Sequence, residues 1–216
     1  LEALNIVEQA PSSLLAGGGD AAVHLMSEAL KRAYADRLGH ARDPRAGATP
    51  LDWLLSKDLA AMRFATIDPD RAAAGVAPAM QDGDTTYLCV ADGQGMMVSL
   101  IQSVSAAFGS GIIAGDTGIV LNNRVGRGFS LIDGHPNHYA PGRKPMSTLN
   151  CYSVMSPAGE ALVVGGTPGG DGQPQWGLQA LTGLIDGGLD VQAAIETPRW
   201  SNWPGTDPAD LPAPYR

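Results

Sequence analysis

Positive charge is scarce in this sequence, and it is not gathered in one place. The chain has 14 Lys and Arg against 22 Asp and Glu, which gives a formal net charge of −8. A surface that binds nucleic acid needs clustered basic residues, and the nearest approach to a cluster is Arg124, Arg127, Arg143 and Lys144. No apolar run reaches the length of a membrane span. We therefore expect neither a nucleic-acid partner nor a membrane partner.

Cysteines are also few, and the residue spacings typical of metal-binding motifs are absent. Cys89 and Cys151 lie far apart in apolar, strand-like runs, and we expect two buried free thiols. The alternative is a single disulfide, which would imply an oxidising compartment. His135 and His138 are close together, but without a CxxC or HExxH spacing they indicate a solvated loop. We expect no metal and no cofactor.

The sequence does contain enough apolar residues for a core. Hydrophobic residues make up 44% and charged residues 17% of the 216 positions, which suits one domain, or one domain and part of another. The chain has no initiator Met and ends in a Pro-rich stretch, so we expect a fragment or one part of a larger assembly.

The first third of the chain has a helical pattern. Apolar residues recur every three or four positions over residues 23–34, with Asp20 as the expected N-cap. A second helical region is predicted over residues 49–64, starting at a Thr-Pro pair. A short third helix is expected to open at Asp68. Residues 76–84 are polar and are expected to be exposed.

The pattern changes at Thr85 to one that is typical of strands. We expect a hairpin of residues 85–90 and 96–103, and a second pair of strands at residues 149–155 and 161–165. Helices are predicted at residues 175–185 and from Val191 to Pro198. Strands with helices before and after them indicate a layered α+β sheet protein.

Local motifs alone give weak indications of chemistry. The Gly-rich run 165–172 follows an expected strand and precedes an expected helix, where backbone N–H groups can receive an oxyanion. It fits neither a P-loop nor a dinucleotide fingerprint, and by itself it indicates a tight turn. There is no GxSxG elbow. Thr85 and Thr86 alone indicate only the start of a strand.

Several motifs, taken together and in register, resemble the γ-glutamyltransferase family. Leu4-Asn5-Ile6 and Tyr34-Ala35-Asp36-Arg37 are similar to the end of that family's large subunit. The segments that resemble its small subunit are Thr85-Thr86-Tyr87, residues 108–115, residues 118–123, residues 144–148 and Pro168-Gly169-Gly170.

The resemblance implies the αββα sandwich of N-terminal-nucleophile hydrolases and a precursor that cleaves itself between Asp84 and Thr85. Residues 1–84 would then end the large subunit, and residues 85–216 would form a small subunit that is incomplete at its C-terminus. The freed amine of Thr85 would serve as the base for its own hydroxyl. Gly169 and Gly170 match the glycines of the oxyanion hole. The partner implied is the remainder of the large subunit.

Other roles also follow from the resemblance. Ser103 stands where the family has a threonine that hydrogen-bonds the nucleophile. Thr86 is retained and is expected to bind substrate. Ser147 and Thr148 match a pair of serines near the substrate carboxylate. Ser105 replaces an asparagine that helps to hold the γ-glutamyl group.

The sequence departs from the family after Asn123. The family has an acid there that binds the substrate ammonium, whereas this chain has Arg124 and Arg127. Arginine favours a carboxylate, although both arginines also have the alternative of pairing with carboxylates of the protein itself. The pattern is closer to divergent members, including cephalosporin-acylase-like amidases.

We therefore expect a self-processing Thr-nucleophile hydrolase or acyltransferase that acts through an acyl-enzyme on a small acid-bearing amide or acyl compound. Three alternatives stay open: a genuine γ-glutamyltransferase or glutathione hydrolase, a hydrolase of carbon–carbon bonds, and an unprocessed, inactive homologue with a binding role.

Overall fold

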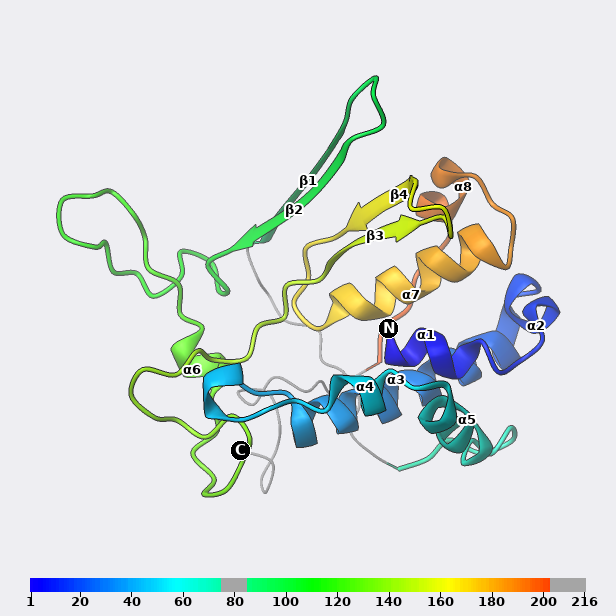
Figure 1. Ribbon diagram of the computed structural model, residues 1–216, viewed down its shortest axis with the longest axis horizontal. Coiled ribbons are helices and arrows are strands. Elements are labelled where there is room, and N and C mark those ends of the chain that lie inside the picture. The colour runs from blue at the N-terminus through cyan, green and yellow to red at the C-terminus, as the bar shows by residue number, and fades with distance from the viewer. Residues whose placement is uncertain (75–84, 203–216) are drawn as a thin grey trace.

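The computed structural model describes residues 1–74 and 85–202 (Figure 1). Helices fill the first part, as the sequence predicted. They are α1 (Glu2–Val7), α2 (Ser12–Ala16), α3 (Gly19–His40), the 3₁₀ turn η1 (Pro44–Ala46), α4 (Leu51–Leu54) and α5 (Lys57–Ala65).

The start of α3 differs from the prediction. Asp20 is not the N-cap, because the helix already begins at Gly19 and Gly18 is its cap with a φ of 60°. That left-handed conformation favours glycine, and two glycines therefore set where the helix starts. Asp20 lies in the first turn, where a carboxylate favours the positive end of the helix dipole.

The helical region predicted over residues 49–64 is two helices rather than one. The chain leaves α4 at Leu55, and Ser56 then caps α5 by accepting a hydrogen bond from the backbone N–H of Leu59 at 3.1 Å. A serine that binds the backbone in this way starts a new helix rather than continuing the old one.

The third helix expected at Asp68 is wrong, because residues 66–74 contain no helix. Their backbone groups bind side chains instead. The Ala73 N–H donates to the Glu28 carboxylate at 3.2 Å, Lys31 donates to the Ala73 carbonyl at 2.9 Å, and Asp68 accepts from the Asp70 N–H. The bonds of Ala73 hold this irregular segment against α3.

The two predicted hairpins are confirmed. Strands β1 (Thr85–Ala91) and β2 (Met97–Ser103) pair antiparallel, with Thr85 opposite Ser103. The Asp92 carboxylate closes their turn by accepting from two backbone N–H groups. Strands β3 (Cys151–Met155) and β4 (Ala161–Gly166) form the second pair.

A close contact joins the two hairpins. The Tyr87 ring lies against Gly166, where an added Cβ would come within 2.5 Å of a ring carbon. The Tyr87 hydroxyl is 3.0 Å from the Ser99 hydroxyl, which donates to the Gly165 carbonyl at 3.2 Å. Glycine at position 166 therefore lets β1 and β2 pack on β4.

Three further helices complete the described chain: α6 (Val125–Gly128), α7 (Gly172–Ile185) and α8 (Val191–Glu196). The last two were predicted, and α7 begins earlier than expected, at Gly172. Figure 1 shows α7 running beneath β3 and β4. The Asp190 side chain caps α8 by accepting from the Ala193 N–H at 2.8 Å.

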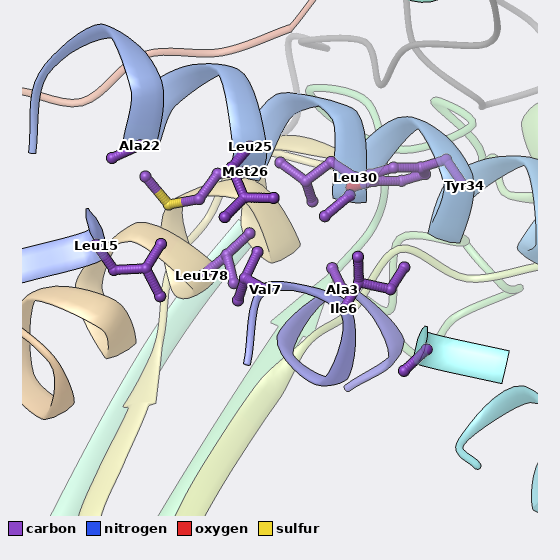
Figure 2. Packing of buried hydrophobic residues seen from close by; sticks show 12 residues of the cluster. Ala3, Ile6, Val7, Leu15, Ala22, Leu25, Met26, Leu30, Tyr34 and Leu178 are labelled. Carbon is purple, nitrogen blue, oxygen red and sulfur yellow. The ribbon is translucent and has the colours of Figure 1, made fainter. Parts of the chain in front are cut away.

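The main hydrophobic core lies among the helices (Figure 2). Ile6 and Val7 of α1, Leu30 and Met26 of α3, and Leu178 of α7 pack together with seven other buried residues. Leu178 comes from the far side of the expected cleavage site in the sequence. Segments 1–84 and 85–216 thus share one core.

The outer face of the first hairpin is uncovered by the described residues. Leu88, Leu100, Val90 and Val98 form cross-strand pairs on it and are 44–58% exposed. The hairpin extends away from the helices (Figure 1).

Both cysteines are free, but they are exposed, so the prediction of buried thiols is wrong. Cys89 lies toward the tip of the projecting hairpin, and Cys151 lies on an open strand face. An apolar strand pattern indicates a face that can be buried, and the described residues do not bury these two.

Candidate active site

Thr85 and Ser103 face each other across the β1–β2 ladder. Because they are directly opposite in register, their side chains lie on the same face of the hairpin. The Thr85 Oγ1 donates a hydrogen bond to the Ser103 Oγ at 3.0 Å, and the backbone N–H of Ser105 donates to the same oxygen at 3.0 Å. Ser103 is thereby fixed from the main chain, and it in turn fixes the Thr85 hydroxyl.

The turn after Ser103 brings Asn123 to this pair. The Asn123 side-chain oxygen accepts from the Ala106 N–H at 2.9 Å, and the Asn123 backbone N–H donates to the Val104 carbonyl at 3.2 Å. Ser105 is buried with a φ of 79°, a conformation that is strained for a residue other than glycine. Within the described residues its hydroxyl has no hydrogen-bond partner.

Arg124 follows Asn123 and reaches the segment before β3. Its Nη2 donates to the Thr148 hydroxyl at 3.1 Å, and Thr148 is buried. Ser147 is exposed, and its hydroxyl accepts from the Leu149 N–H at 3.3 Å. Arg127 lies one turn further along, in α6, and is partly buried. A guanidinium therefore lies beside one of the two predicted carboxylate-binding hydroxyls.

The Gly-rich loop between β4 and α7 presents backbone donors. Gly169 and Gly170 have φ values of 121° and 53°, a range that favours glycine. Their carbonyls accept from the N–H groups of Gly172 and Gln173 at 2.8 and 3.2 Å. Within residues 1–74 and 85–202, neither glycine N–H has a hydrogen-bond acceptor.

This loop and Thr85 lie at the same end of the joined hairpins. Tyr87, two residues beyond Thr85, packs on Gly166, and the loop begins immediately after Gly166. Figure 1 shows β1 starting and β4 ending at the same side of the two hairpins, and a loop leading from β4 down to α7. A hydroxyl and a pair of N–H donors at one edge are the parts that acyl transfer needs.

A family model decides what kind of protein carries this arrangement. The model described as Gamma-glutamyltranspeptidase matches residues 1–207. The chain belongs to the gamma-glutamyltranspeptidase family. The resemblance found in the sequence is thus confirmed over almost the whole chain.

Two relatives and one solved structure place the chain within the family. The glutathione hydrolase-like YwrD proenzyme of Bacillus subtilis is 37% identical over 197 residues, which cover 91% of this chain and 37% of that protein. The oxamate amidohydrolase proenzyme of Klebsiella pneumoniae is 40% identical over 178 residues, which cover 82% of this chain and 33% of that protein. Cephalosporin acylase from Bacillus halodurans matches with a TM-score of 0.74 at 32% identity, over 93% of this chain and 37% of that chain.

These comparisons confirm the predicted fold class. The chain is an α+β protein with the N-terminal-nucleophile hydrolase fold that the acylase shares. It spans roughly a third of the length of the relatives that it matches.

Two predicted site residues are not placed beside Thr85 and Ser103 by the structure. Thr86 is exposed and, by strand alternation, lies on the opposite face of β1 from Thr85. Its role in substrate binding stays a prediction. Asp84, on the other side of the expected cut, lies outside the described residues.

A groove of about 830 Å³ lies between α1, α3, α7 and residues 147–155. Ser147 and Thr148 line it, whereas Thr85, Ser103 and the two glycines are not among its described lining residues. The groove therefore includes the predicted carboxylate-binding pair, but not the predicted nucleophile or the two glycines.

Sequence reasoning missed the part that Asn123 plays. It was noted as a motif residue, but its side chain also ties the turn after Ser103 to Arg124. An asparagine next to a strand end is too common for this role to be predicted. Within the described residues, no three His, Cys, Asp or Glu gather as a metal site requires, and no helix is long and apolar enough to span a membrane.

Proposed function

We propose that this chain is the catalytic core of a self-processing hydrolase or acyltransferase in which Thr85 is the nucleophile. The hydrogen bond from the Thr85 Oγ1 to the Ser103 Oγ carries the proposal, because it fixes a hydroxyl at the first residue of β1, where the expected cut would make it N-terminal. The names of the relatives support it, since each is a proenzyme.

The first step proposed is cleavage of the chain before Thr85. The Thr85 hydroxyl attacks the carbonyl carbon of Asp84, its proton passes to the Thr85 nitrogen, and the C–N bond breaks to leave an ester. Water then hydrolyses the ester. The products are segment 1–84, which ends in the new carboxylate of Asp84, and segment 85–216, which begins with the free amine of Thr85.

The free amine then acts as the base for turnover. Its pKa of roughly 8 lets it take the hydroxyl proton as Thr85 attacks a substrate carbonyl. The backbone N–H groups of Gly169 and Gly170 donate hydrogen bonds to the carbonyl oxygen as it becomes negatively charged. The intermediate collapses to an acyl-enzyme as the leaving amine takes the proton, and water or a second amine releases the acyl group.

Arg124 supports a substrate that carries an acid group. The guanidinium beside Thr148 suits a carboxylate, which it binds through charge-assisted hydrogen bonds. The buried Ser105 hydroxyl offers a further polar contact, and Arg127 and Ser147 are proposed to line the same site. The Klebsiella relative is named for an amide of this kind, oxamate. We therefore propose small acid-bearing amides as substrates.

A panel of amides tests the proposal. The processed protein is expected to hydrolyse carboxylate-bearing amides such as oxamate faster than matched amides without the acid, and Thr85→Ala is expected to lose all turnover. Thr85→Ser keeps a hydroxyl and should retain part of it. Turnover that survives in Thr85→Ala would rule out the proposed nucleophile.

The second candidate is a genuine glutathione hydrolase, which the name of the Bacillus subtilis relative favours. Release of the aniline from a γ-glutamyl anilide separates the two. Turnover of that compound faster than any acid-bearing amide would favour the second candidate.

A further inference from the structure

Asp171 stands directly after the two glycines and is the N-cap residue of α7. An aspartate at this position normally accepts a hydrogen bond from the first turn of its own helix. Asp171 makes no such bond, and its side chain is completely buried. Because burying an unpaired carboxylate is costly, this side chain needs a partner other than its own helix.

The partner of the carboxylate comes from the other segment of the chain. The Arg37 Nη1 in α3 donates to the Asp171 Oδ1 at 2.6 Å, and the Arg37 side chain is only 20% exposed. These residues are 134 positions apart in the sequence. The ion pair therefore crosses from segment 1–84 to segment 85–216.

A second residue of α3 binds the main chain at the same point. The Tyr34 hydroxyl donates to the Asp171 carbonyl at 2.6 Å, and the Gln175 amide donates to that oxygen at 3.2 Å. Burial and the nearby Asp171 charge raise the pKa of Tyr34 well above its ordinary value. The hydroxyl thus stays protonated and remains a donor at working pH. Arg37 lies 5.5 Å from the centre of the Tyr34 ring.

The loop needs such support because its glycines are conformationally free. Gly169 and Gly170 both have positive φ values, and glycine pays little steric cost for leaving such a conformation. Catalysis by backbone donors requires them to be aimed before the charge develops. Fixing both the side chain and the carbonyl of Asp171 immobilises the end of the loop.

We propose that Arg37 and Tyr34 are positioning residues that, by holding Asp171, aim the backbone N–H groups of Gly169 and Gly170 at the developing oxyanion. This inference rests on the proposed function, because it takes those N–H groups as the oxyanion donors. It also requires segment 1–84 to stay bound after the cut.

Two conservative variants test the inference in the processed full-length protein. Tyr34→Phe removes one hydrogen bond without changing shape, and Arg37→Lys keeps the charge but loses the planar fork. We expect kcat to fall by roughly 10-fold to 100-fold in each, with KM changed by less than about 2-fold, since only the transition state carries the oxyanion.

Arg63→Lys is the matched control. Arg63 of α5 pairs with Asp36 of α3 at 2.5 and 2.9 Å, so this variant weakens an ion pair of α3 that does not involve Asp171. We expect its kcat to match that of the unmodified protein when all are compared well below their melting temperatures. If Arg37→Lys does not fold, Tyr34→Phe alone decides.

A loss of kcat in Tyr34→Phe no larger than in Arg63→Lys would overturn the inference, and so would a loss confined to KM. The proposed function is judged separately by Thr85→Ala. If Thr85→Ala is inactive while Tyr34→Phe is fully active, only the positioning role fails. If Thr85→Ala is active, the proposed function fails with it.

Discussion

At the scale of single residues, Gly169 places the tightest constraint on the candidate site. A Cβ at this position would lie 2.2 Å from a ring carbon of Trp176, and the φ of 121° is unfavourable for any other residue. Either the ring or the loop must move when a side chain is added.

Gly169→Ala is expected to lower kcat by about 100-fold or more, because the displaced loop no longer aims its N–H donor. Gly39→Ala is the control: Gly39 is in α3, and nothing lies within 4 Å of its added Cβ. Steady-state kinetics measure kcat in the two variants. A Gly169→Ala protein with the same kcat as Gly39→Ala would contradict the account.

Arg124 is the residue that should decide substrate charge. Arg124→Met is expected to raise KM for an acid-bearing amide by about 10-fold to 100-fold, the effect of losing one hydrogen bond to a charged group. KM for a matched uncharged amide should hardly change. Arg199→Met, which removes an exposed guanidinium from the segment after α8, is the control. Equal changes for both amides would argue against a carboxylate at Arg124.

The residues of the site were predictable to different degrees. Thr85, Ser103, Gly169 and Gly170 were named from motifs in register, and the structure places them at one end of the hairpins. Asp171 was not given a role, because the helix was expected to begin only at residue 175. Its pairing with Arg37 depends on how α3 packs on α7, which no local pattern contains.

At the scale of elements, α3 organises the molecule. One side of it carries Tyr34 and Arg37, which hold the glycine loop. Glu28, only 1% exposed, binds Lys31, Arg32 and the Ala73 N–H, which fixes the segment that leads toward Thr85. One helix therefore contacts both the glycine loop and the described segment 66–74.

Glu28 should make this support sensitive to acid. Burial alone would raise the pKa of Glu28, but hydrogen bonds from Lys31 and Arg32 outweigh it, so that the pKa lies below its ordinary value of 4.5. A depressed pKa contributes stability that is present above pH 4.5 and is lost as pH falls through the folded-state value.

We expect Glu28→Gln to lower the free energy of unfolding by about 3 kcal/mol at neutral pH, the cost of breaking a buried pair, and to flatten the loss of stability in acid. Urea denaturation on both sides of pH 4.5 measures both effects. An unchanged slope of stability against pH in the variant would contradict this account of α3.

Elements were predicted best where periodicity was strong. The hairpins, α7 and α8 agree with the sequence because alternation and caps are local signals. The helix expected at Asp68 failed because Glu28 and Lys31 capture the backbone of Ala73, a tertiary effect. The break at Ser56 was missed because apolar spacing continues across it.

At the scale of the whole molecule, one core joins the two segments. Leu178 of α7 is 3% exposed and packs with residues of α1, α2 and α3. The Arg37–Asp171 pair crosses the same boundary. Cleavage before Thr85 would cut the backbone without separating these contacts.

Leu178→Ala is therefore expected to cost about 2–5 kcal/mol of stability and to weaken the association of the two segments after cleavage. The unmodified pair should elute together in size-exclusion chromatography and unfold in a single thermal transition. Ile185→Ala, which truncates an exposed residue of the same helix, should change neither property. Separate elution of the unmodified segments would disprove the shared core.

The overall fold was predictable from motifs spread over almost the whole chain, whereas exposure was not. The apolar pairs Leu88–Leu100 and Val90–Val98 have the pattern of a buried face, yet the described residues leave them open. Alternation tells which side of a strand is apolar. It does not tell what covers that side.

Mass spectrometry of the purified protein tests the central claim most directly. The account predicts a polypeptide whose first residue is Thr85, together with a partner that ends at Asp84. The Thr85→Ala protein should stay in one piece. An intact Asp84–Thr85 bond in the unmodified, mature protein would contradict the account and favour an unprocessed homologue with a binding role.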